Sequence, residues 1–533
     1  MAAIGLWGLD RGGMWRDEAV SFQVGRRTVP QIWRLLHGVD AVHGLYYLLL
    51  HAVLAVHPGE VVLRLPSVCA AACTAGLVAA LGARLVRPRV GLWAGLLYAV
   101  TPMAGHYAQE GRSYALVAAG ATGATLLFVR GVRGGSWWPY GAVLGLACWL
   151  HEFAVLLLLA HAVSLALARA GARVWRGWGC AAAAVVAALL PMVLVSRAQA
   201  AQLAWLRAPT AQTAGGLLRH FFGPSDEVYW VCLGLAVVGL LGLVGRRGEP
   251  TCAGVALPVT VVPPAVLMLA SQLSPLYVDR YVLFALSGAP LLVAAGAERL
   301  ARAAGSAGRR WPVLRVPAPP RAGCSAGTAG PRAALLKRHA VPSPVRPLGR
   351  GSRPVRRVPA VTLTGVLAVV LAAVHQFPVL QKDRDPGRRP DDLAAIARAA
   401  AWELRPGDPV LFVPAALRNT ALAYPRGFPA VRDVALVAPA AESGTLYGRE
   451  TGAAELRRRL ARLDRVWVVG DRKLLAGRSA PRNAVERAKV AALWQQFTGG
   501  EQMVRDGVTV RLYVRPVSAR SGPLPTPPRP VRR

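Results

Sequence analysis

Residues 67–80 read "SVCAAACTAGLVAA", the centre of an apolar run that covers 62–83 and stops at Arg84. A run of this length matches the roughly 17–25 residues with which a helix crosses the hydrocarbon layer of a bilayer. Its small residues suit close packing against neighbouring helices, so Cys69 and Cys73 are interpreted as packing residues and not as metal ligands. The stretch therefore predicts a transmembrane helix.

The composition of the whole chain agrees with this prediction. Of its 533 residues, 54% are hydrophobic and only 17% are charged, whereas soluble domains carry about 25% charged residues. The mean hydropathy is +0.37. The seven cysteines are scattered and most lie inside apolar segments, so no disulfide framework is indicated. We expect a polytopic α-helical membrane protein with about ten or eleven spans.

Further apolar runs follow along the chain. Spans are predicted at roughly 62–83, 90–106, 114–129, 137–150, 152–168, 178–196, 228–245, 252–271, 280–297 and 359–377. Arginines gather in alternate loops, whereas the intervening loops hold aromatic residues, carboxylates and histidines. The positive-inside rule makes the arginine-rich loops cytoplasmic and the others extracytoplasmic, and it predicts a multi-pass protein of the plasma membrane.

The formal net charge of +36 does not indicate a nucleic-acid partner, because the basic residues form short strips between apolar runs and no basic face of a folded domain. The largest strip, residues 298–358, holds fourteen Lys or Arg against one acid, Glu298. It is rich in Pro, Gly and Arg and has no apolar periodicity, which predicts a disordered cytoplasmic linker. One more span, 359–377, then returns the chain to the outside.

The composition changes again after this last span. The stretch "DDLAAIARAAAWELRPGDPVLFVP" (391–414) has the pattern of an amphipathic helix, a Pro-Gly turn and a buried strand. The stretch "ELRRRLARLDRVWVVGD" (455–471) repeats this order. Residues 385–516 are therefore predicted to form a small extracytoplasmic α/β domain, followed by a Pro-rich disordered tail at 517–533.

The first residues, "MAAIGLWGL" (1–9), are apolar but too short to span a bilayer. They show no basic region or small-residue cleavage site of a signal peptide. Because the charge alternation puts Asp17 outside, we expect them to be the end of a first helix that begins upstream and is missing from the module at 1–297.

An acidic pair, Asp17 and Glu18 in "WRDEAVSF" (15–22), follows this apolar start. Carboxylates at a membrane surface are commonly solvated loop residues, but other polar groups gather at the same predicted outer edge. They lie in "DAVHGLYYLLLHAVL" (40–54), "HYAQEGRSYAL" (106–116) and "YVDRYVLF" (277–284). Charged groups this close to hydrocarbon are costly and are therefore candidates for function.

These motifs, in this order and together with "LRLPS" (63–67), resemble the polytopic GT-C glycosyltransferases. The resemblance is to the family-39-like branch, related to protein O-mannosyltransferases and lipid A aminoarabinose transferases. It runs through about residues 6–297 and more loosely to 377, and the C-terminal region resembles the tail domains of bacterial members. The chain reads "HGLYY" at 43–47 where many relatives have a Pro-containing "HPPLYY" form, which bears on the shape of that loop.

The resemblance implies a sugar donor linked to a polyprenyl phosphate and a lipid, glycan or protein acceptor on the outer face of the bilayer. The resemblance suggests mannose first and does not identify the sugar; it also implies a single displacement that would invert the anomeric carbon. Asp17 corresponds to the acidic motif of the family and is the candidate base that deprotonates the acceptor hydroxyl. Glu18, the second candidate catalytic residue, is expected to orient the loop or to help bind a metal or the acceptor.

Arginine suits the donor phosphate because its fork binds bidentately and stays charged. Arg112 and Arg280 are the candidates, with Arg16 next; each has an alternative role as a topological anchor or a headgroup contact. Glu110 is either a site residue or an ion-pair partner of Arg112. The remaining acceptor-binding or supporting candidates are His43, Tyr46 and Tyr281.

Polar groups at the outer edge also raise the question of a metal. The candidates His43, His106, His151 and Glu152 match no zinc spacing, so no metal site is predicted and a divalent ion is not required. The alternative functions are a transporter or flippase of a lipid-linked sugar and a non-catalytic assembly protein of the cell envelope. Transporters tend to place polar groups in mid-membrane and to repeat their halves, a pattern that the sequence lacks.

Overall fold

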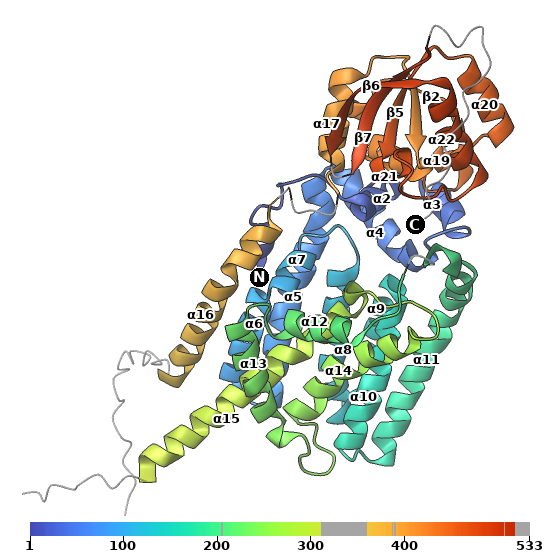
Figure 1. Cartoon of the computed structure of the whole chain (residues 1–533). Coiled ribbons are helices and arrows are strands. Elements are labelled where there is room, and N and C mark those ends of the chain that lie inside the picture. Colours follow the sequence, from blue (N-terminus) through green and yellow to red (C-terminus); the bar gives the residue numbers. More distant parts are fainter. Residues whose placement is uncertain (204–205, 311–359, 386, 388–390, 506, 517–533) are drawn as a thin grey trace, which may run out of the picture.

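A computed structural model describes residues 1–203, 206–310, 360–385, 387, 391–505 and 507–516 (Figure 1). Its helical membrane part, up to residue 385, has the helices α1 (Ala2–Leu6), α2 (Arg16–Gly25), α3 (Val29–Leu36), α4 (Gly44–Val56), α5 (Glu60–Leu85), α6 (Pro88–Val100), α7 (Pro102–Tyr107), α8 (Tyr114–Val132), α9 (Trp138–Leu150), α10 (Leu156–Leu167), α11 (Ala172–Ala198), α12 (Ala211–Phe222), α13 (Asp226–Gly239), α14 (Cys252–Ala270), α15 (Gly288–Arg310) and α16 (Ala360–Asp383). Short 3-10 helices lie at η1 (Ala41–His43), η2 (Glu152–Val155) and η5 (Asp279–Ser287).

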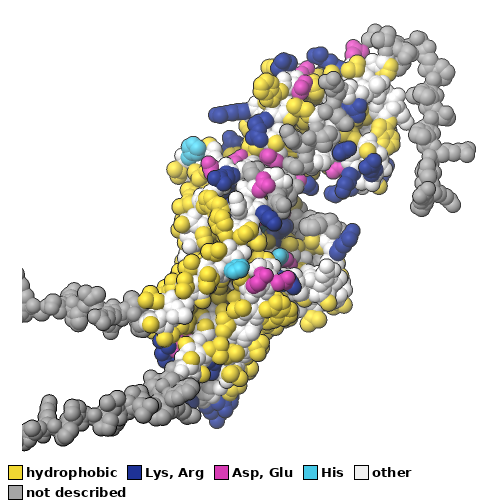
Figure 2. Space-filling view, turned by 60° about the vertical axis from the view of Figure 1, so that its left-hand side comes forward, with side chains coloured by type: hydrophobic (Ala, Val, Ile, Leu, Met, Phe, Trp, Pro, Cys, Tyr) yellow, Lys and Arg dark blue, Asp and Glu magenta, His cyan; other side chains and the backbone are white. Residues whose placement is uncertain are grey.

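Six helical stretches among the described residues are long and apolar enough to cross a membrane, or seven if the bent pair α12–α13 is counted as one span. They are α5, α8, α11, α14, α16 and the continuous stretch from η5 into α15. Hydrophobic side chains cover the membrane part, and most charged side chains lie over the C-terminal region (Figure 2). The polytopic membrane class is confirmed, and the count of ten or eleven spans stays a prediction.

The predicted spans differ from the helices in identifiable ways. The run 90–106 is divided into α6 and α7, because Pro102 lacks the N–H that would continue α6 and instead begins α7. The helix α15 continues to Arg310, so the first residues of the predicted disordered linker are helical. The rest of that linker and the predicted tail at 517–533 lie outside the described residues.

The acidic pair lies in a helix and not in a loop. Asp17 and Glu18 occupy the first turn of α2, where the positive end of the helix dipole favours carboxylates. The sequence alone did not indicate this helix, and α2 gives both side chains a fixed direction.

Residues 391–516, called the C-terminal domain below, form an α/β fold (Figure 1). Its elements are α17 (Leu393–Glu403), β1 (Pro409–Val413), α18 (Arg418–Ala423), β2 (Arg432–Asp433), β3 (Leu436–Ala438), α19 (Ala440–Ser443), β4 (Arg449–Glu450), α20 (Ala453–Ala461), β5 (Arg465–Asp471), α21 (Arg472–Leu475), α22 (Ala484–Gln496), β6 (Thr498–Arg505) and β7 (Val508–Val514). The main sheet has the order β2-β1-β5-β7-β6, with β1 parallel to β2 and β5 and with β7 antiparallel to its neighbours. The Val-rich strands β1 and β5 lie at its centre and are largely buried, as their apolar runs predict.

The C-terminal domain sits on the N-terminal end of α2, with α3 and α4 beside it (Figure 1). Asp391 forms an ion pair with Arg16 at 2.9 Å, and Asn419 donates a hydrogen bond of 2.9 Å to the Arg16 carbonyl. The Tyr424 hydroxyl accepts from the Met14 amide at 2.7 Å and donates to Glu60. These contacts place the C-terminal domain directly beside the acidic pair.

Candidate active site

Asp17 lies beside Arg280, which the sequence separates from it by most of the membrane part. The Asp17 Oδ2 atom is 3.3 Å from Arg280 Nη2, and the two side chains are 31% and 18% exposed. Arg280 also donates from Nε to the Tyr114 hydroxyl at 3.2 Å. Its guanidinium lies 5.5–5.8 Å from the ring centres of Trp15, Tyr114 and Tyr281, distances at which aromatic faces attract a cation. Apart from its ion pair with Asp17, Arg280 is held by neutral groups, the Tyr114 hydroxyl and three aromatic rings.

Arg112 is buried on the same side of α2. It donates from Nη1 to the Ser21 hydroxyl at 3.1 Å and from Nη2 to His43 Nε2 at 2.7 Å. Ser21 lies one turn along α2 from Asp17 and donates to the Asp17 carbonyl. Among the described residues no carboxylate lies within ion-pair distance of Arg112, so of the two alternatives for Glu110 the ion pair with Arg112 is not observed. A buried cation without a carboxylate is costly, and such a group is suited to an anionic ligand.

Glu18 has a different environment from its neighbour. Its two oxygens accept from Arg64 Nε and Nη2, both at 2.8 Å, and Oε1 also accepts from the Gly111 amide at 2.9 Å. The side chains of Glu18 and Arg64 are 1% and 0% exposed. Glu18 therefore ties α2 to α5 and to the loop that carries Arg112. This geometry fits the orienting role and leaves no open oxygen for a metal or an acceptor.

Several buried polar atoms around Arg112 have no hydrogen-bond partner among the described residues. They are Arg112 Nε, Glu110 Oε2, His43 Nδ1, Tyr46 OH and His151 Nδ1. Since about 90% or more of buried polar groups in proteins are hydrogen-bonded, such a cluster is typical of a site that receives a polar ligand. The His151 ring lies 6.0 Å from that of His43 and 4.7 Å from that of Tyr281, so the candidates His43, Tyr46, Glu110 and Tyr281 belong to this cluster.

The remaining candidates lie elsewhere or are committed to other partners. The Arg16 side chain points to Asp391 of the C-terminal domain and is 57% exposed. His106 is paired with Asp383 of α16 at 2.6 Å, and Glu152 accepts from Ser196 at 2.7 Å. No group of three or more His, Cys, Asp or Glu side chains that could hold a metal ion occurs in the part of the chain that the structure describes.

The structure adds residues that the sequence did not single out. Arg64 lies in the motif "LRLPS", which marked the region but not the partner of this arginine. Tyr114, which binds Arg280, ends the motif "EGRSY". Ser21 carried no signal beyond its spacing of four residues from Asp17 on a helix.

The buried carboxyl group of Glu110 should make the stability of the folded protein depend on pH. Burial raises the pKa of its carboxyl from an ordinary 4.5 to about 7. Because the folded state holds this proton more tightly than the unfolded state, the stabilisation is complete below the ordinary pKa and is lost as the pH rises through the raised one. Between about pH 5 and pH 8, Glu110→Gln should lose less thermal stability than the wild type. Parallel curves for the two proteins would contradict the burial of a protonated Glu110, and the exposed Glu442→Gln is the matched control.

Comparisons with known proteins show what the chain is similar to. Residues 43–196 match the sequence model of the family described as dolichyl-phosphate-mannose-protein mannosyltransferase. The crystal structure of ArnT from Cupriavidus metallidurans in the apo state is similar over 98% of this chain and 97% of that chain, with a TM-score of 0.56 and 12% identity. The structure of the same protein bound to undecaprenyl phosphate gives the same coverage and identity with a TM-score of 0.55. No curated protein sequence matches significantly. Residues 43–196 are therefore similar to this mannosyltransferase family, and the whole chain shares the fold of the ArnT structure.

Proposed function

We propose that the chain is a glycosyltransferase that moves a sugar from a polyprenyl phosphate to an acceptor hydroxyl at the outer face of the plasma membrane. The observation that carries the proposal is the contact between Asp17 and Arg280 at 3.3 Å. Next to α2 lies the buried Arg112, which has no carboxylate within ion-pair distance among the described residues. A carboxylate that accepts a proton and two arginines that hold a phosphate are the groups that this reaction needs.

In the proposed reaction the Asp17 carboxylate accepts the proton of the acceptor hydroxyl. The hydroxyl oxygen attacks the anomeric carbon, and the bond between this carbon and the phosphate oxygen breaks. The polyprenyl phosphate leaves with the bonding electrons, and Arg280 and Arg112 stabilise its added negative charge. One displacement inverts the configuration of the anomeric carbon. Glu18 supports the reaction by fixing the loop of Arg112, and His43, Tyr46, Glu110 and Tyr281 offer polar contacts to the sugar.

An apolar cavity supports a lipid-linked donor. A cavity of about 340 Å³ lies between α6, α13, α15 and α16, with walls such as Trp93, Val231 and Val369. Farther along α16, Val379 and Asp383 line a second cavity of about 260 Å³ together with Tyr107. The Tyr107 ring lies 6.1 Å from that of Tyr114, the partner of Arg280. We infer that an isoprenoid chain follows α16 through these cavities and brings its phosphate toward Arg280.

The comparisons support the class of donor. The matched family is named for dolichyl phosphate mannose, and the solved structure of ArnT carries undecaprenyl phosphate. Both are polyprenyl phosphates, and mannose is the sugar that the family name suggests. In the proposed topology residues 298–358 are cytoplasmic and residues 385–516 are extracytoplasmic, which puts Asp17 and a lipid, glycan or protein acceptor on the same side.

The proposal is tested with the full chain in proteoliposomes that contain a radiolabelled polyprenyl-phosphate mannose. Membranes from a strain that lacks the gene are added outside as the pool of acceptors. Label that passes from the lipid to the added membranes supports the transferase. Label that crosses the bilayer while still attached to its lipid would identify a transporter, and no change in either quantity would favour an assembly protein.

Arg280→Ala should weaken donor binding more than it lowers the maximal rate. Hydrogen bonds to charged groups contribute about 1.5–3 kcal/mol, so we expect the KM for the donor to rise about 10- to 100-fold. Initial rates at varied donor concentration measure this change. Arg219→Ala, which removes an exposed arginine paired with Asp226, is the control. An unchanged donor KM in Arg280→Ala would remove Arg280 from the phosphate site.

A further inference from the structure

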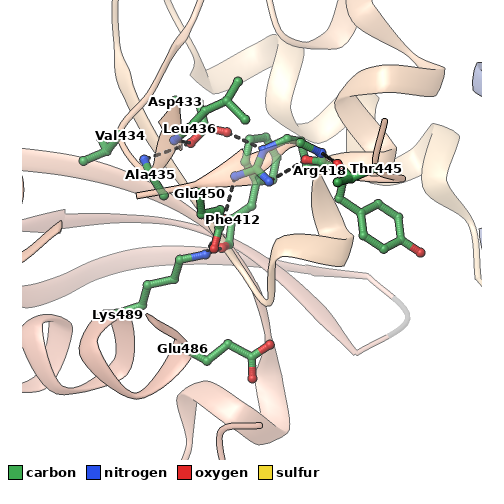
Figure 3. A network of polar contacts seen from close by, with 12 residues as sticks. Phe412, Arg418, Asp433, Val434, Ala435, Leu436, Thr445, Glu450, Glu486 and Lys489 are labelled. Carbon is green, nitrogen blue, oxygen red and sulfur yellow. Dashed lines mark hydrogen bonds and ion pairs between the residues drawn. The ribbon is translucent and has the colours of Figure 1, made fainter. Parts of the chain in front are cut away.

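The C-terminal domain buries a network of four charged side chains (Figure 3). Arg418 on α18 donates to Asp433 at 2.5 Å and to Glu450 at 2.8 Å. Lys489 on α22 donates to the same Glu450 oxygen at 2.6 Å and to the Phe412 carbonyl at 2.8 Å. Two cations thus face two carboxylates. Because breaking a buried pair leaves a costly unpaired charge, the network fixes the segment from Asp433 to Glu450 firmly on the domain.

The same network reaches toward α2. Arg418 also donates a hydrogen bond of 2.7 Å from Nη1 to the Tyr447 carbonyl. The next residue, Asn419, donates to the carbonyl of Arg16, the residue before Asp17. From the other side, Gln23 on α2 donates to the Leu446 carbonyl at 3.0 Å. The backbone at 446–447 is therefore held by both α18 and α2, so its position relative to Asp17 is fixed.

Tyr447 follows Leu446, whose carbonyl accepts hydrogen bonds from Gln23 of α2 and from Arg27 just after it. The Tyr447 side chain is half-buried and packs against the core shared with the membrane part. Burial and the negative charges of Asp40 and Asp17 raise the pKa of Tyr447 to about 12, while Arg16 and Arg112 oppose the shift. The contacts of Gln23 with Leu446 and of Arg418 with the Tyr447 carbonyl place Tyr447 on the side of the C-terminal domain that faces α2.

We propose that Tyr447 binds the acceptor and that Arg418 is the residue that positions it. The lipid donor reaches Arg280 from the membrane part, so the acceptor approaches from the side of the C-terminal domain, where Tyr447 lies. A tyrosine offers an apolar ring together with a hydroxyl, which suits a ligand that must present one hydroxyl to Asp17. This inference rests on the proposed transferase function and assigns its acceptor side to the C-terminal domain.

The test uses the full chain, a labelled polyprenyl-phosphate mannose as donor, and membranes of the gene-deletion strain as the acceptor pool. Tyr447→Ala should raise the amount of acceptor membrane needed for half-maximal rate about tenfold, with the donor KM changed less than about twofold. Tyr447→Phe keeps the ring, so the amount of acceptor membrane that it needs should lie between the amounts for Tyr447→Ala and the wild type. Arg418→Lys keeps the charge but loses the fork that reaches Tyr447, so it should produce the same selective effect.

Because Arg418 acts on the acceptor only by positioning Tyr447, Arg418→Lys combined with Tyr447→Ala should add little to Tyr447→Ala alone. Trp402→Ala removes an exposed aromatic ring of the same domain, and Arg458→Lys alters an exposed arginine; both should behave as wild type. The Tyr447 variants test acceptor binding even if Arg418→Lys folds poorly, because the Tyr447 side chain is not part of the charge network. If the wild-type protein transfers no sugar, the proposed function is wrong. If the wild-type protein transfers sugar and Tyr447→Ala needs the same amount of acceptor membrane for half-maximal rate, only this inference is wrong.

Discussion

Asp17→Asn is expected to lower the rate of sugar transfer by about 10²–10⁴-fold, the contribution that general base catalysis typically makes. Asparagine has nearly the shape of aspartate but cannot accept the proton of the acceptor hydroxyl. Binding of the donor should persist, because Arg280 and Arg112 remain in place and Arg280 loses only its carboxylate neighbour. Initial rates and donor binding, measured on the same preparations, separate the two effects.

Asp10→Asn is the matched control, since Asp10 is an exposed aspartate of the same N-terminal region. It should transfer sugar at the rate of the wild type. If Asp17→Asn keeps a rate close to that of the control, Asp17 is a solvated carboxylate and the assignment as base is wrong.

The largest effect on stability is expected at the buried pair of Glu18 and Arg64. Glu18→Gln leaves the guanidinium of Arg64 buried without its carboxylate, and breaking a buried pair in this way costs about 3–5 kcal/mol. Thermal or denaturant unfolding of the purified protein in detergent measures the loss. Glu455→Gln, which alters an exposed ion pair, should leave the stability nearly unchanged.

A double variant sharpens this prediction. Replacing both Glu18 and Arg64 by Met removes the two charges together, which often restores stability. Recovery should be partial, because Arg64 also donates to the carbonyls of Leu9 and Gly13, which would lose their partner. A Glu18→Gln variant as stable as the wild type would contradict the burial of this pair.

The class of the protein and a shared location of Asp17, Arg112 and Arg280 were predictable because each depends on local sequence. Apolar runs of bilayer length indicate a membrane protein wherever they occur. The charge alternation put Asp17, Arg112 and Arg280 on one side, and the structure brings all three to α2. Apolar length alone did not reveal that Pro102 divides one predicted span, or that α15 continues past its predicted end.

Contacts between distant segments were not predictable from one sequence. Glu18 forms an ion pair with Arg64 of another helix, and Arg16 forms one with Asp391 of another domain. No local sequence pattern selects either partner. The alternative that pairs Glu110 with Arg112 is not observed, for a local reason. The two residues lie in the turn between α7 and α8, where side chains two positions apart need not share a face.

The anomeric configuration of the product tests the central claim most directly. The full chain is supplied with a ¹³C-labelled polyprenyl-phosphate sugar of known configuration, and NMR of the transferred sugar gives the configuration of the product. Direct attack by a hydroxyl that Asp17 deprotonates predicts inversion. Retention would mean that a residue of the chain first bonds to the sugar, and it would contradict Asp17 as the base of a single displacement.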